Sequence, residues 1–201
     1  MAHSIENVIF DMGGVLMVFD GHAFARNFTS NDKDAELLWR AYFGRTEWAL
    51  VDAGALGFDT LERLARRELP ERLWPNLEAC ARDWPKKSVP IPETNALVPR
   101  IKTAGLGVYL LSNAGVRIGE QLDHMPANEY FDGRVVSAFE RIMKPDPAIY
   151  QLACMRFGID PATALFVDDN EANCEGAELA GLQSFHFAGD ANALERTIFS
   201  K

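Results

Sequence analysis

The chain has 201 residues, 48% of them hydrophobic and 24% charged, with a formal net charge of −9. This composition is ordinary for a globular protein, and the length fits one domain or one domain with a modest insert. The acidic balance argues against nucleic acid as the main partner. Three cysteines without paired spacing indicate a reducing compartment. The sequence has neither a signal-peptide pattern nor an apolar run of about 18 residues, so we expect a cytoplasmic protein away from membranes.

The first expected element is a buried strand over residues 5–10. The segment is β-branched and aromatic and lacks polar alternation, as a strand covered on both faces should. It ends at Asp11, and Gly13 and Gly14 follow in a loop to residue 20. Ligands bind outside the carboxyl ends of the strands of a parallel sheet, so we expect Asp11 to face a crevice.

From about residue 21 to residue 84 apolar residues recur at helical spacing and no strand pattern is present. This pattern predicts an all-helical insert of four or five helices. The proline-rich segment 85–92 predicts a hinge or linker that leads back to the main domain. We therefore expect a catalytic core made of residues 1–20 and 86–201, and a helical cap made of residues 21–85.

After Pro92 the pattern alternates between the two element types. Helices are expected over 93–104, 116–125, 146–157, 170–180 and 191–198, and strands over 107–111, 134–137, 165–167 and 184–187. Such alternation predicts an α/β fold with a parallel sheet covered by helices on both faces.

Polar residues lie at the carboxyl ends of the expected strands and would face the same crevice as Asp11. They are Ser112 and Asn113, Asp168 and Asp169, and also Lys144 if the loop at 142–145 lies over that edge. Two or three carboxylates suit Mg²⁺, a hard cation that prefers oxygen ligands. The hydroxyl and the backbone N–H groups of the glycine loop suit phosphate oxygens. The set fits phosphoryl transfer, with Asp11 attacking phosphorus and water resolving an aspartyl-phosphate.

Four segments resemble, in order, the four motifs of the haloacid dehalogenase superfamily. They are FDMGGVL at 10–16, LLSN at 110–113, KPDPAIY at 144–150 and VDDN at 167–170. The resemblance covers essentially the whole chain, because the helical insert lies where that family carries its cap. It implies a Rossmann-like core, a mobile helical cap and Mg²⁺-dependent phosphatase activity. The nearest similarity is to bacterial glucose-1-phosphate phosphatases and to the phosphatase domain of soluble epoxide hydrolase.

The resemblance also implies a role for each motif residue. Asp11 would be the nucleophile and a metal ligand, and the carbonyl of Gly13 a second ligand. Asp169 would bind the metal directly, with Asp168 alongside it. The phosphate would contact Ser112, Asn113, the Gly13–Gly14 loop and Lys144, which would bridge nucleophile and phosphate. Asn173 is a candidate to brace the last loop.

One position departs from the family pattern. Many phosphatases of this family carry a second aspartate two residues after the nucleophile, where it serves as general acid and base, and this chain has Gly13 there. The metal-binding carbonyl is preserved, but protonation of the leaving group loses its usual donor, a change typically worth about 10²–10⁴-fold in rate. Asp20 is one candidate replacement, although it is also a plausible helix N-cap.

The leading hypothesis is a Mg²⁺-dependent phosphomonoesterase that acts on a small phosphorylated metabolite such as a sugar phosphate, as a monomer or homodimer. One alternative is carbon–halogen hydrolysis by the same nucleophile, which needs no metal. Another is a regulatory protein that binds a phosphorylated ligand on a catalytically weakened scaffold.

Overall fold

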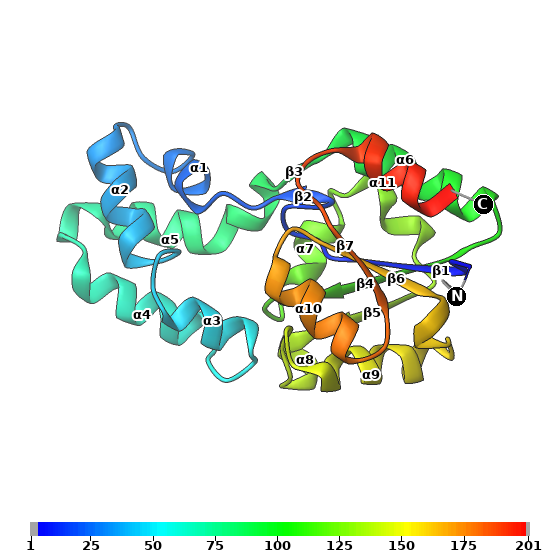
Figure 1. The fold of residues 1–201 in the computed structure, drawn as a ribbon. Coiled ribbons are helices and arrows are strands. Elements are labelled where there is room, and N and C mark those ends of the chain that lie inside the picture. Colours follow the sequence, from blue (N-terminus) through cyan, green and yellow to red (C-terminus); the bar gives the residue numbers. More distant parts are fainter. Residues whose placement is uncertain (1–3, 200–201) are drawn as a thin grey trace.

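The computed structural model describes residues 4–199 and contains a five-stranded parallel sheet in the order β5-β4-β1-β6-β7 (Figure 1). The strands of this sheet are β1 (Asn7–Phe10), β4 (Gly107–Ser112), β5 (Gly133–Val136), β6 (Ala164–Asp168) and β7 (Gln183–His186). The expected α/β fold with a doubly wound parallel sheet is confirmed. The first expected strand is central, since β1 pairs with β4 on one side and β6 on the other.

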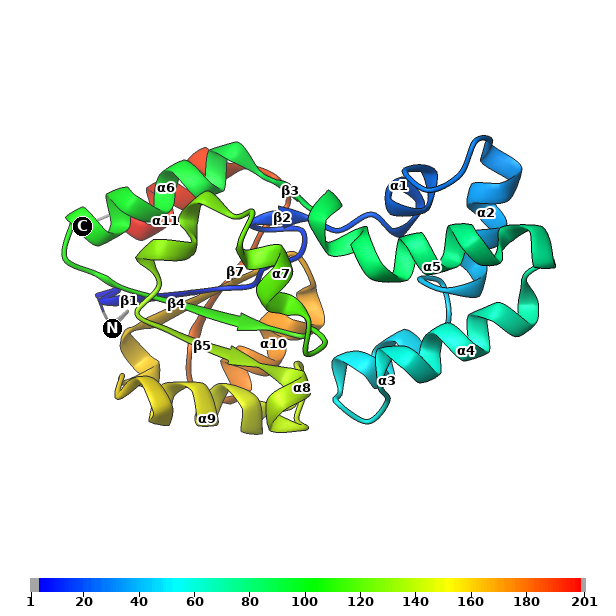
Figure 2. The same ribbon diagram turned by 180° about the vertical axis from the view of Figure 1, so that it is seen from behind.

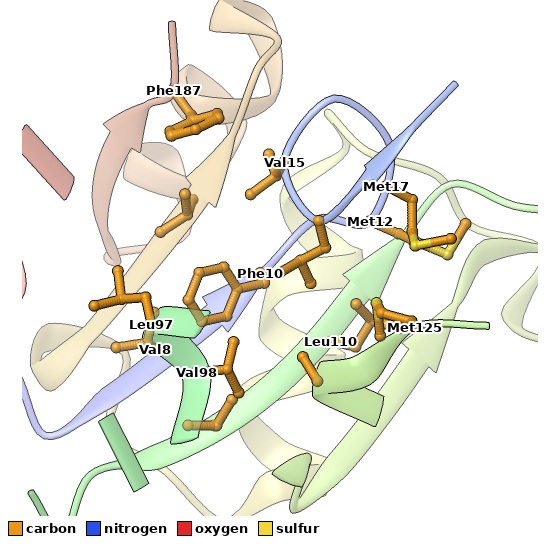
Figure 3. Close-up of a cluster of buried hydrophobic side chains, with 14 of the residues drawn as sticks. Val8, Phe10, Met12, Val15, Met17, Leu97, Val98, Leu110, Met125 and Phe187 are labelled. Atoms are coloured by element: carbon orange, nitrogen blue, oxygen red, sulfur yellow. The ribbon is translucent and has the colours of Figure 1, made fainter. Parts of the chain in front are cut away.

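The absence of polar alternation in β1 follows from its central position. Val8 and Phe10 point into one hydrophobic cluster, while Ile9 points into the cluster on the opposite face. Successive side chains of a strand alternate between the two faces, so both faces of β1 require apolar residues. Figure 3 shows Val8 and Phe10 among the side chains of the first cluster, close to Leu97 and Val98. The central strand that delivers Asp11 is thus fixed by packing on both sides.

Helices cover both faces of the sheet. The core helices are α6 (Pro92–Thr103), α7 (Ile118–Leu122), α8 (Ser137–Glu140), α9 (Pro147–Phe157), α10 (Glu171–Leu179) and α11 (Ala191–Phe199). Apolar side chains of α6 and α11 pack in the first cluster, and those of α9 and α10 in the second. The short helix α8 was not expected from the sequence pattern. No helix among residues 4–199 combines the length and apolar character that a membrane crossing requires.

A second body, made of helices alone, lies beside the carboxyl ends of the strands (Figures 1 and 2). Its α-helices are α1 (Gly21–Arg26), α2 (Asp32–Ala41), α3 (Glu47–Asp52), α4 (Phe58–Glu68) and α5 (Trp74–Asp83). Two short 3₁₀ helices accompany them, Glu71–Leu73 and Trp84–Lys87. These helices enclose a hydrophobic cluster of their own, so the expected all-helical cap is confirmed.

The two connections between core and cap run side by side. Strand β2 (Met17–Val18) pairs antiparallel with β3 (Val89–Pro90). The amide of Asn95, in α6, donates a hydrogen bond of 2.7 Å to the carbonyl of Leu16 and fixes this ribbon to the core. The segment predicted as a hinge or linker therefore carries regular structure: it forms half of a two-stranded ribbon.

The cap is docked onto the core at two places. At the end of α3, the Ser137 hydroxyl of the core donates to the carbonyl oxygen of Asp52 over 2.5 Å. At the end of α5, the Arg117 guanidinium of the core donates to the carbonyls of Ala81 and Arg82. Helix α3 lies close to α8 in both ribbon views (Figures 1 and 2). The cap therefore contacts the segments that follow two neighbouring strands, β4 and β5.

One helical glycine sets the distance between α10 and the loop that carries Lys144. A Cβ atom on buried Gly176 would lie 2.2 Å from the backbone oxygen of Pro145. We expect Gly176→Ala to destabilise the fold by about 1–3 kcal/mol, as overpacking does, although alanine is the better helix former. Urea unfolding measures the change.

The matched control is Gly119→Ala, because Gly119 is also helical but a Cβ there would meet nothing within 4 Å. This variant should be stabilised by about 0.4–1 kcal/mol through the unfolded state. Equal effects of the two substitutions would contradict the close approach of α10 to the Pro145 backbone.

Candidate active site

The carboxyl ends of three neighbouring strands bring the polar residues together. Phe10 in β1 pairs with Leu110 in β4 and with Val167 in β6, so Asp11, Ser112 and Asp168 emerge at the same edge. The backbone N–H of Asp11 donates to the carbonyl of Val167 over 2.9 Å, which continues the ladder of hydrogen bonds to Asp11. The prediction that these residues converge on one crevice follows from this register.

Lys144 lies at the centre of the site. Its Nζ atom is 2.8 Å from Oδ1 of Asp11 and 2.6 Å from Oδ2 of Asp168. The Lys144 side chain is only 1% exposed and that of Asp168 is fully buried. Burying unpaired charges costs several kcal/mol, and here one ammonium compensates two carboxylates. The loop that carries Lys144 therefore does lie over the edge of the sheet.

Burial and charge act in opposite directions on this group. Burial raises the pKa of Asp11 to about 6, the Lys144 ammonium opposes that rise, and the Asp168 carboxylate adds to it. Burial alone would lower the pKa of Lys144, but the charges of Asp11 and Asp168 outweigh it, so the pKa is raised. Lys144 is accordingly a fixed positive charge at neutral pH and unsuited to proton transfer.

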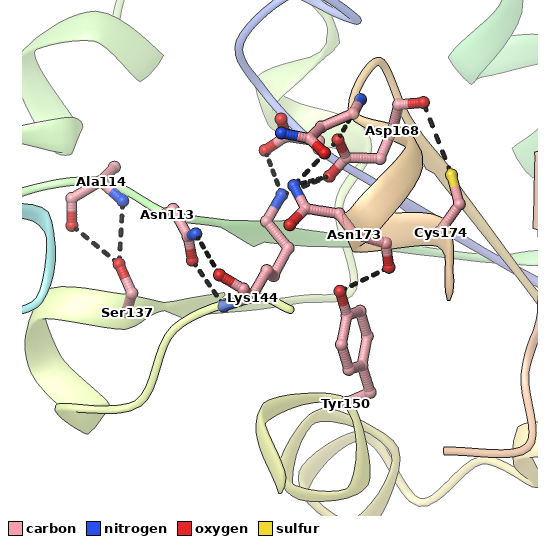
Figure 4. A network of polar contacts seen from close by, with 10 residues as sticks. Asn113, Ala114, Ser137, Lys144, Tyr150, Asp168, Asn173 and Cys174 are labelled. Atoms are coloured by element: carbon pink, nitrogen blue, oxygen red, sulfur yellow. Dashed lines mark hydrogen bonds and ion pairs between the residues drawn. The ribbon is translucent and has the colours of Figure 1, made fainter. Parts of the chain in front are cut away.

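Asp168 and its neighbour Asp169 have different surroundings. Asp168 accepts hydrogen bonds from Lys144, from the backbone N–H of Asn170 and, at both carboxylate oxygens, from Nδ2 of Asn173 (Figure 4). The carbonyl of Asn173 accepts in turn from the Tyr150 hydroxyl over 2.6 Å. Asp169 is exposed and lines the cavity instead. Asn173 thus braces the Asp168 loop, and Asp169 is the carboxylate left open to a ligand.

The Asn113 side chain makes two contacts with the backbone of Lys144. Its Oδ1 accepts from the Lys144 N–H and its Nδ2 donates to the Lys144 carbonyl, each over 2.9 Å (Figure 4). The side-chain amide of Asn113 is therefore fully engaged with the Lys144 backbone. Ser112, buried at the end of β4, lines the cavity next to it.

The glycine loop after Asp11 approaches Asp169 closely. Gly14 has a φ of +70°, and a Cβ atom there would lie 2.1 Å from Oδ2 of Asp169. The positive φ favours glycine at this position, and any other residue would also displace the Asp169 carboxylate. At Gly13 a Cβ atom would meet only the Cβ of Phe19, at an ordinary 3.7 Å. The backbone at Gly13 therefore leaves room for a Cβ atom.

The core and the cap together enclose a cavity of about 310 Å³. Its walls include Asp11, Ser112, Asn113 and Asp169 from the core, and Trp48, Asp52, Phe58 and Trp84 from the cap. The cap side is largely aromatic, which suits a small organic group held above the polar floor.

The cap side of this cavity was not identified from sequence. Helical periodicity placed its aromatic residues in a cap core, and none of Trp48, Asp52 or Phe58 stands out from that pattern. The acid that the sequence did suggest, Asp20, is exposed and caps α1 by accepting from the Ala23 N–H over 3.0 Å. It is not among the residues that line the cavity. The helix-cap interpretation of Asp20 is the one the structure supports.

Three carboxylates could hold a divalent cation. One oxygen each of Asp11, Asp168 and Asp169 lie within 4.8 Å of one another. All the donors are oxygens, as Mg²⁺ prefers, and the open side of Asp169 leaves room for water ligands. The donor set therefore fits Mg²⁺, while Lys144 already neutralises part of the negative charge.

The sequence profile of the haloacid dehalogenase-like hydrolases matches residues 5–181, which include β1, the cap and the strand ends just described. The chain belongs to this family. Membership makes it a hydrolase.

Relatives within the family divide between two chemistries. (S)-2-haloacid dehalogenase 4A of Burkholderia cepacia is 28% identical over 213 residues, which cover 97% of this chain and 88% of that protein. A phosphoserine phosphatase of Thermus thermophilus is 31% identical over 118 residues, which cover 57% of this chain and 47% of that protein. The identities are too low to choose between the two reactions.

Solved structures divide in the same way. A dehalogenase crystal structure covers 100% of both chains with a TM-score of 0.78 at 21% identity. A family member from Bacteroides thetaiotaomicron, in complex with magnesium and inorganic phosphate, covers 93% of this chain and 96% of its own, with a TM-score of 0.69 at 22% identity. At such identities the likeness establishes the shared fold.

Removal of the central ammonium provides a test of the site. Lys144→Met leaves Asp11 and Asp168 buried without their cation, and we expect a loss of about 3–5 kcal/mol in unfolding free energy at neutral pH. The pKa of Asp11 in the folded state already exceeds its usual value. Ionisation of Asp11 therefore lowers the free energy of unfolding as pH rises from about 4 through about 6. Without Lys144 that pKa rises further, and the penalty should be greater at pH 8 than at pH 5.

Urea unfolding at the two pH values, with a chelator present, measures this difference. Lys86→Met is the matched control, because Lys86 pairs with Asp83 at an exposed position and its loss should change stability little at either pH. A penalty for Lys144→Met that is small, or equal at both pH values, would contradict the buried ion triad.

Proposed function

We propose that the chain is a Mg²⁺-dependent phosphomonoesterase that acts on a small phosphorylated metabolite, such as a sugar phosphate, through an aspartyl-phosphate on Asp11. The observation that carries the proposal is the grouping of Asp11, Asp168 and Asp169 within 4.8 Å beside the Lys144 ammonium. A halide displacement needs one carboxylate nucleophile and no metal. A phosphoryl transfer uses an oxygen-ligated cation and a fixed positive charge, which this arrangement can supply.

Each residue then has a role that its surroundings suit. Asp11 would bind Mg²⁺ through one oxygen and attack phosphorus with the other. Asp169 would bind the metal directly, because its carboxylate is open, and the Gly13 carbonyl would complete the protein ligands. Asp168 would orient Lys144, since its oxygens are engaged by Lys144, Asn170 and Asn173. Bound Mg²⁺ would neutralise phosphate charge.

The substrate phosphate would lie between Asp11 and the loop after β4. The Ser112 hydroxyl, the backbone N–H groups of Asn113 and of the Gly13–Gly14 loop, and the Lys144 ammonium would contact its oxygens. Asp11 attacks in line, the ester oxygen leaves on the side of the cap, and water then hydrolyses the aspartyl-phosphate. Positioning and charge neutralisation would supply most of the acceleration.

The enclosed cavity supports a small substrate. Residues 21–85 would act as a cap domain on the core of residues 1–20 and 86–201, with the β2–β3 ribbon as the connection between them. Aromatic side chains of the cap lie over the polar floor, so the organic part of the substrate would be held there and bulk water excluded.

Carbon–halogen hydrolysis is a second candidate, favoured by the dehalogenase relative that matches 97% of this chain. It would use Asp11 to displace the halide from a small haloacid, with water hydrolysing the resulting ester. Halide release that a chelator leaves unchanged would support it over the phosphatase.

The nucleophile assignment is tested by Asp11→Asn. A screen of small phosphate monoesters with Mg²⁺ should show turnover by the wild type and at least a 10³-fold lower rate for the variant, because an amide cannot form the acyl-phosphate. Asp123→Asn, an exposed substitution at the end of α7, is the control and should retain full activity.

Wild-type turnover should stop on addition of a chelator and return with Mg²⁺. Equal rates for the wild type and Asp11→Asn would overturn the proposal. Tight binding of phosphate esters without any turnover would favour the regulatory alternative.

A further inference from the structure

The cavity contains one acid to which none of the four motifs gives a role. Asp52 is the last residue of cap helix α3 and lines the same cavity as Asp11 and Asp169. It approaches from the cap, whereas the other two acids belong to the core. Its position is therefore on the side toward which the leaving group of a phosphate ester would depart.

Contacts with the core fix Asp52 at this position. Its carbonyl oxygen accepts from the Ser137 hydroxyl over 2.5 Å, and its side chain lines the cavity together with Trp48 and Gly115. Two residues further on, Gly54 lies so close to α8 that a Cβ atom would be 2.1 Å from the Ala138 carbonyl oxygen. The Asp52 carboxyl is thus held at the junction of cap and core.

The protonation behaviour of Asp52 suits proton transfer. Burial raises the pKa of Asp52 to about 7, hydrogen bonds from Gly115 and Trp48 oppose the rise, and the charge of Asp11 adds to it. Near neutral pH such a group is available both as an acid and as a base, which is the condition for efficient general catalysis.

We propose that Asp52 is the general acid and base of the phosphatase reaction, supplied by the cap in place of the aspartate that Gly13 lacks. This inference rests on the function proposed above. Other ionisable groups on the cavity wall are less suitable: Asp11 is the nucleophile, Asp169 is needed for the metal, and Arg117 stays charged and is engaged by Glu120 and by cap carbonyls.

In the first step the Asp52 carboxylic acid donates its proton to the ester oxygen while the bond between that oxygen and phosphorus breaks. The Asp11 carboxylate oxygen forms the new bond to phosphorus, and the leaving group departs as a neutral alcohol. In the second step the Asp52 carboxylate takes a proton from water, whose oxygen bonds to phosphorus. The bond from phosphorus to Asp11 breaks, which releases inorganic phosphate and restores both carboxyl groups.

Cap closure and chemistry are coupled in this arrangement. The acid lies on α3, so it reaches the reacting oxygen only when the contact of Asp52 with Ser137 is made. An open cap would leave the Asp11 site without its proton donor, and water would not be activated.

Asp52→Asn separates this role from a structural one, because asparagine has nearly the same shape and keeps the backbone carbonyl that accepts from Ser137. The experiment measures kcat/KM with Mg²⁺ for a series of substituted phenyl phosphates. We expect Asp52→Asn to lower the rate by about 10²-fold or more for unsubstituted phenyl phosphate but little for nitrophenyl phosphate, whose leaving group needs no proton. With nitrophenyl phosphate the variant should give a burst of one nitrophenol per enzyme and then slow turnover, since the base for the second step is missing.

The pH profile gives a second readout. For phenyl phosphate, wild-type kcat/KM should fall as pH rises through about 7, where Asp52 loses its proton, and this limb should be absent from Asp52→Asn. Exposed Asp59 of α4 offers the matched control, since Asp59→Asn should leave both the leaving-group dependence and the pH profile unchanged.

A rescue variant completes the design. A Cβ atom at Gly13 would make only an ordinary contact with Phe19, so Gly13→Asp combined with Asp52→Asn should restore part of the phenyl phosphate activity. The inference would be overturned if Asp52→Asn lowered kcat/KM equally for all leaving groups, or if the alkaline limb of the pH profile stayed unchanged in that variant. Asp11→Asn would still test the proposed function separately. A wild type that hydrolyses no phosphate monoester of the screen would overturn both.

Discussion

The ammonium of Lys144, buried between the carboxylates of Asp11 and Asp168, is the interaction on which the site depends. Two buried carboxylates at one sheet edge would repel each other and lose their hydration, and a single cation offsets both costs. Lys144 lies in a loop outside both strands, and its ion pairs join Asp11 at the end of the central strand β1 to Asp168 at the end of β6. Its geometry is thus set by three separate segments of the chain.

Hydrogen bonds extend this constraint outward from the triad. Asn113 fixes the Lys144 backbone, Asn173 fixes Asp168, and the Tyr150 hydroxyl of α9 fixes Asn173 (Figure 4). Gly176 allows α10 to approach the Pro145 backbone closely, so the helix and the lysine loop pack as one unit. Asp169, outside this network, keeps a free carboxylate. The structure therefore separates a tightly bonded group of charged residues from Asp169, the most exposed of the three grouped acids.

The cap contributes what the floor lacks. A carboxylate nucleophile and fixed charges suit either of the reactions found among the relatives, and fold alone does not choose between them. Efficient ester hydrolysis, unlike halide displacement, needs a proton donor for the leaving group. Gly13 has no side chain that could be that donor. Asp52 lies opposite the core acids and would be the proton donor, supplied by the cap. It lies where the Ser137 hydroxyl of the core donates to the cap.

The sequence predicted the sheet and the core acids well because both are encoded locally. An apolar run that ends in Asp11 or in Asp168 indicates a strand and its carboxyl end, and parallel register then brings those ends together. Lys144 was predicted only conditionally, since nothing local shows over which edge its loop folds. Asp52 was missed because its significance comes from its contact with Ser137 and from its place on the cavity wall opposite Asp11, both far away in the chain. The β2–β3 ribbon was missed for a different reason, because two-residue strands have no periodic pattern.

The most direct test of the central claim is to trap the covalent intermediate. Enzyme turning over a phosphate monoester with Mg²⁺ is quenched in acid, and its intact mass and peptide masses are measured. The account predicts a mass increase of one phosphoryl group on the peptide that contains Asp11, reversed by hydroxylamine and absent from Asp11→Asn. A phosphoryl group on another residue, or turnover without any labelled enzyme under conditions that trap acyl-phosphates, would contradict it. An ester adduct on Asp11 after incubation with a haloacid, with no adduct from phosphate esters, would show carbon–halogen chemistry instead.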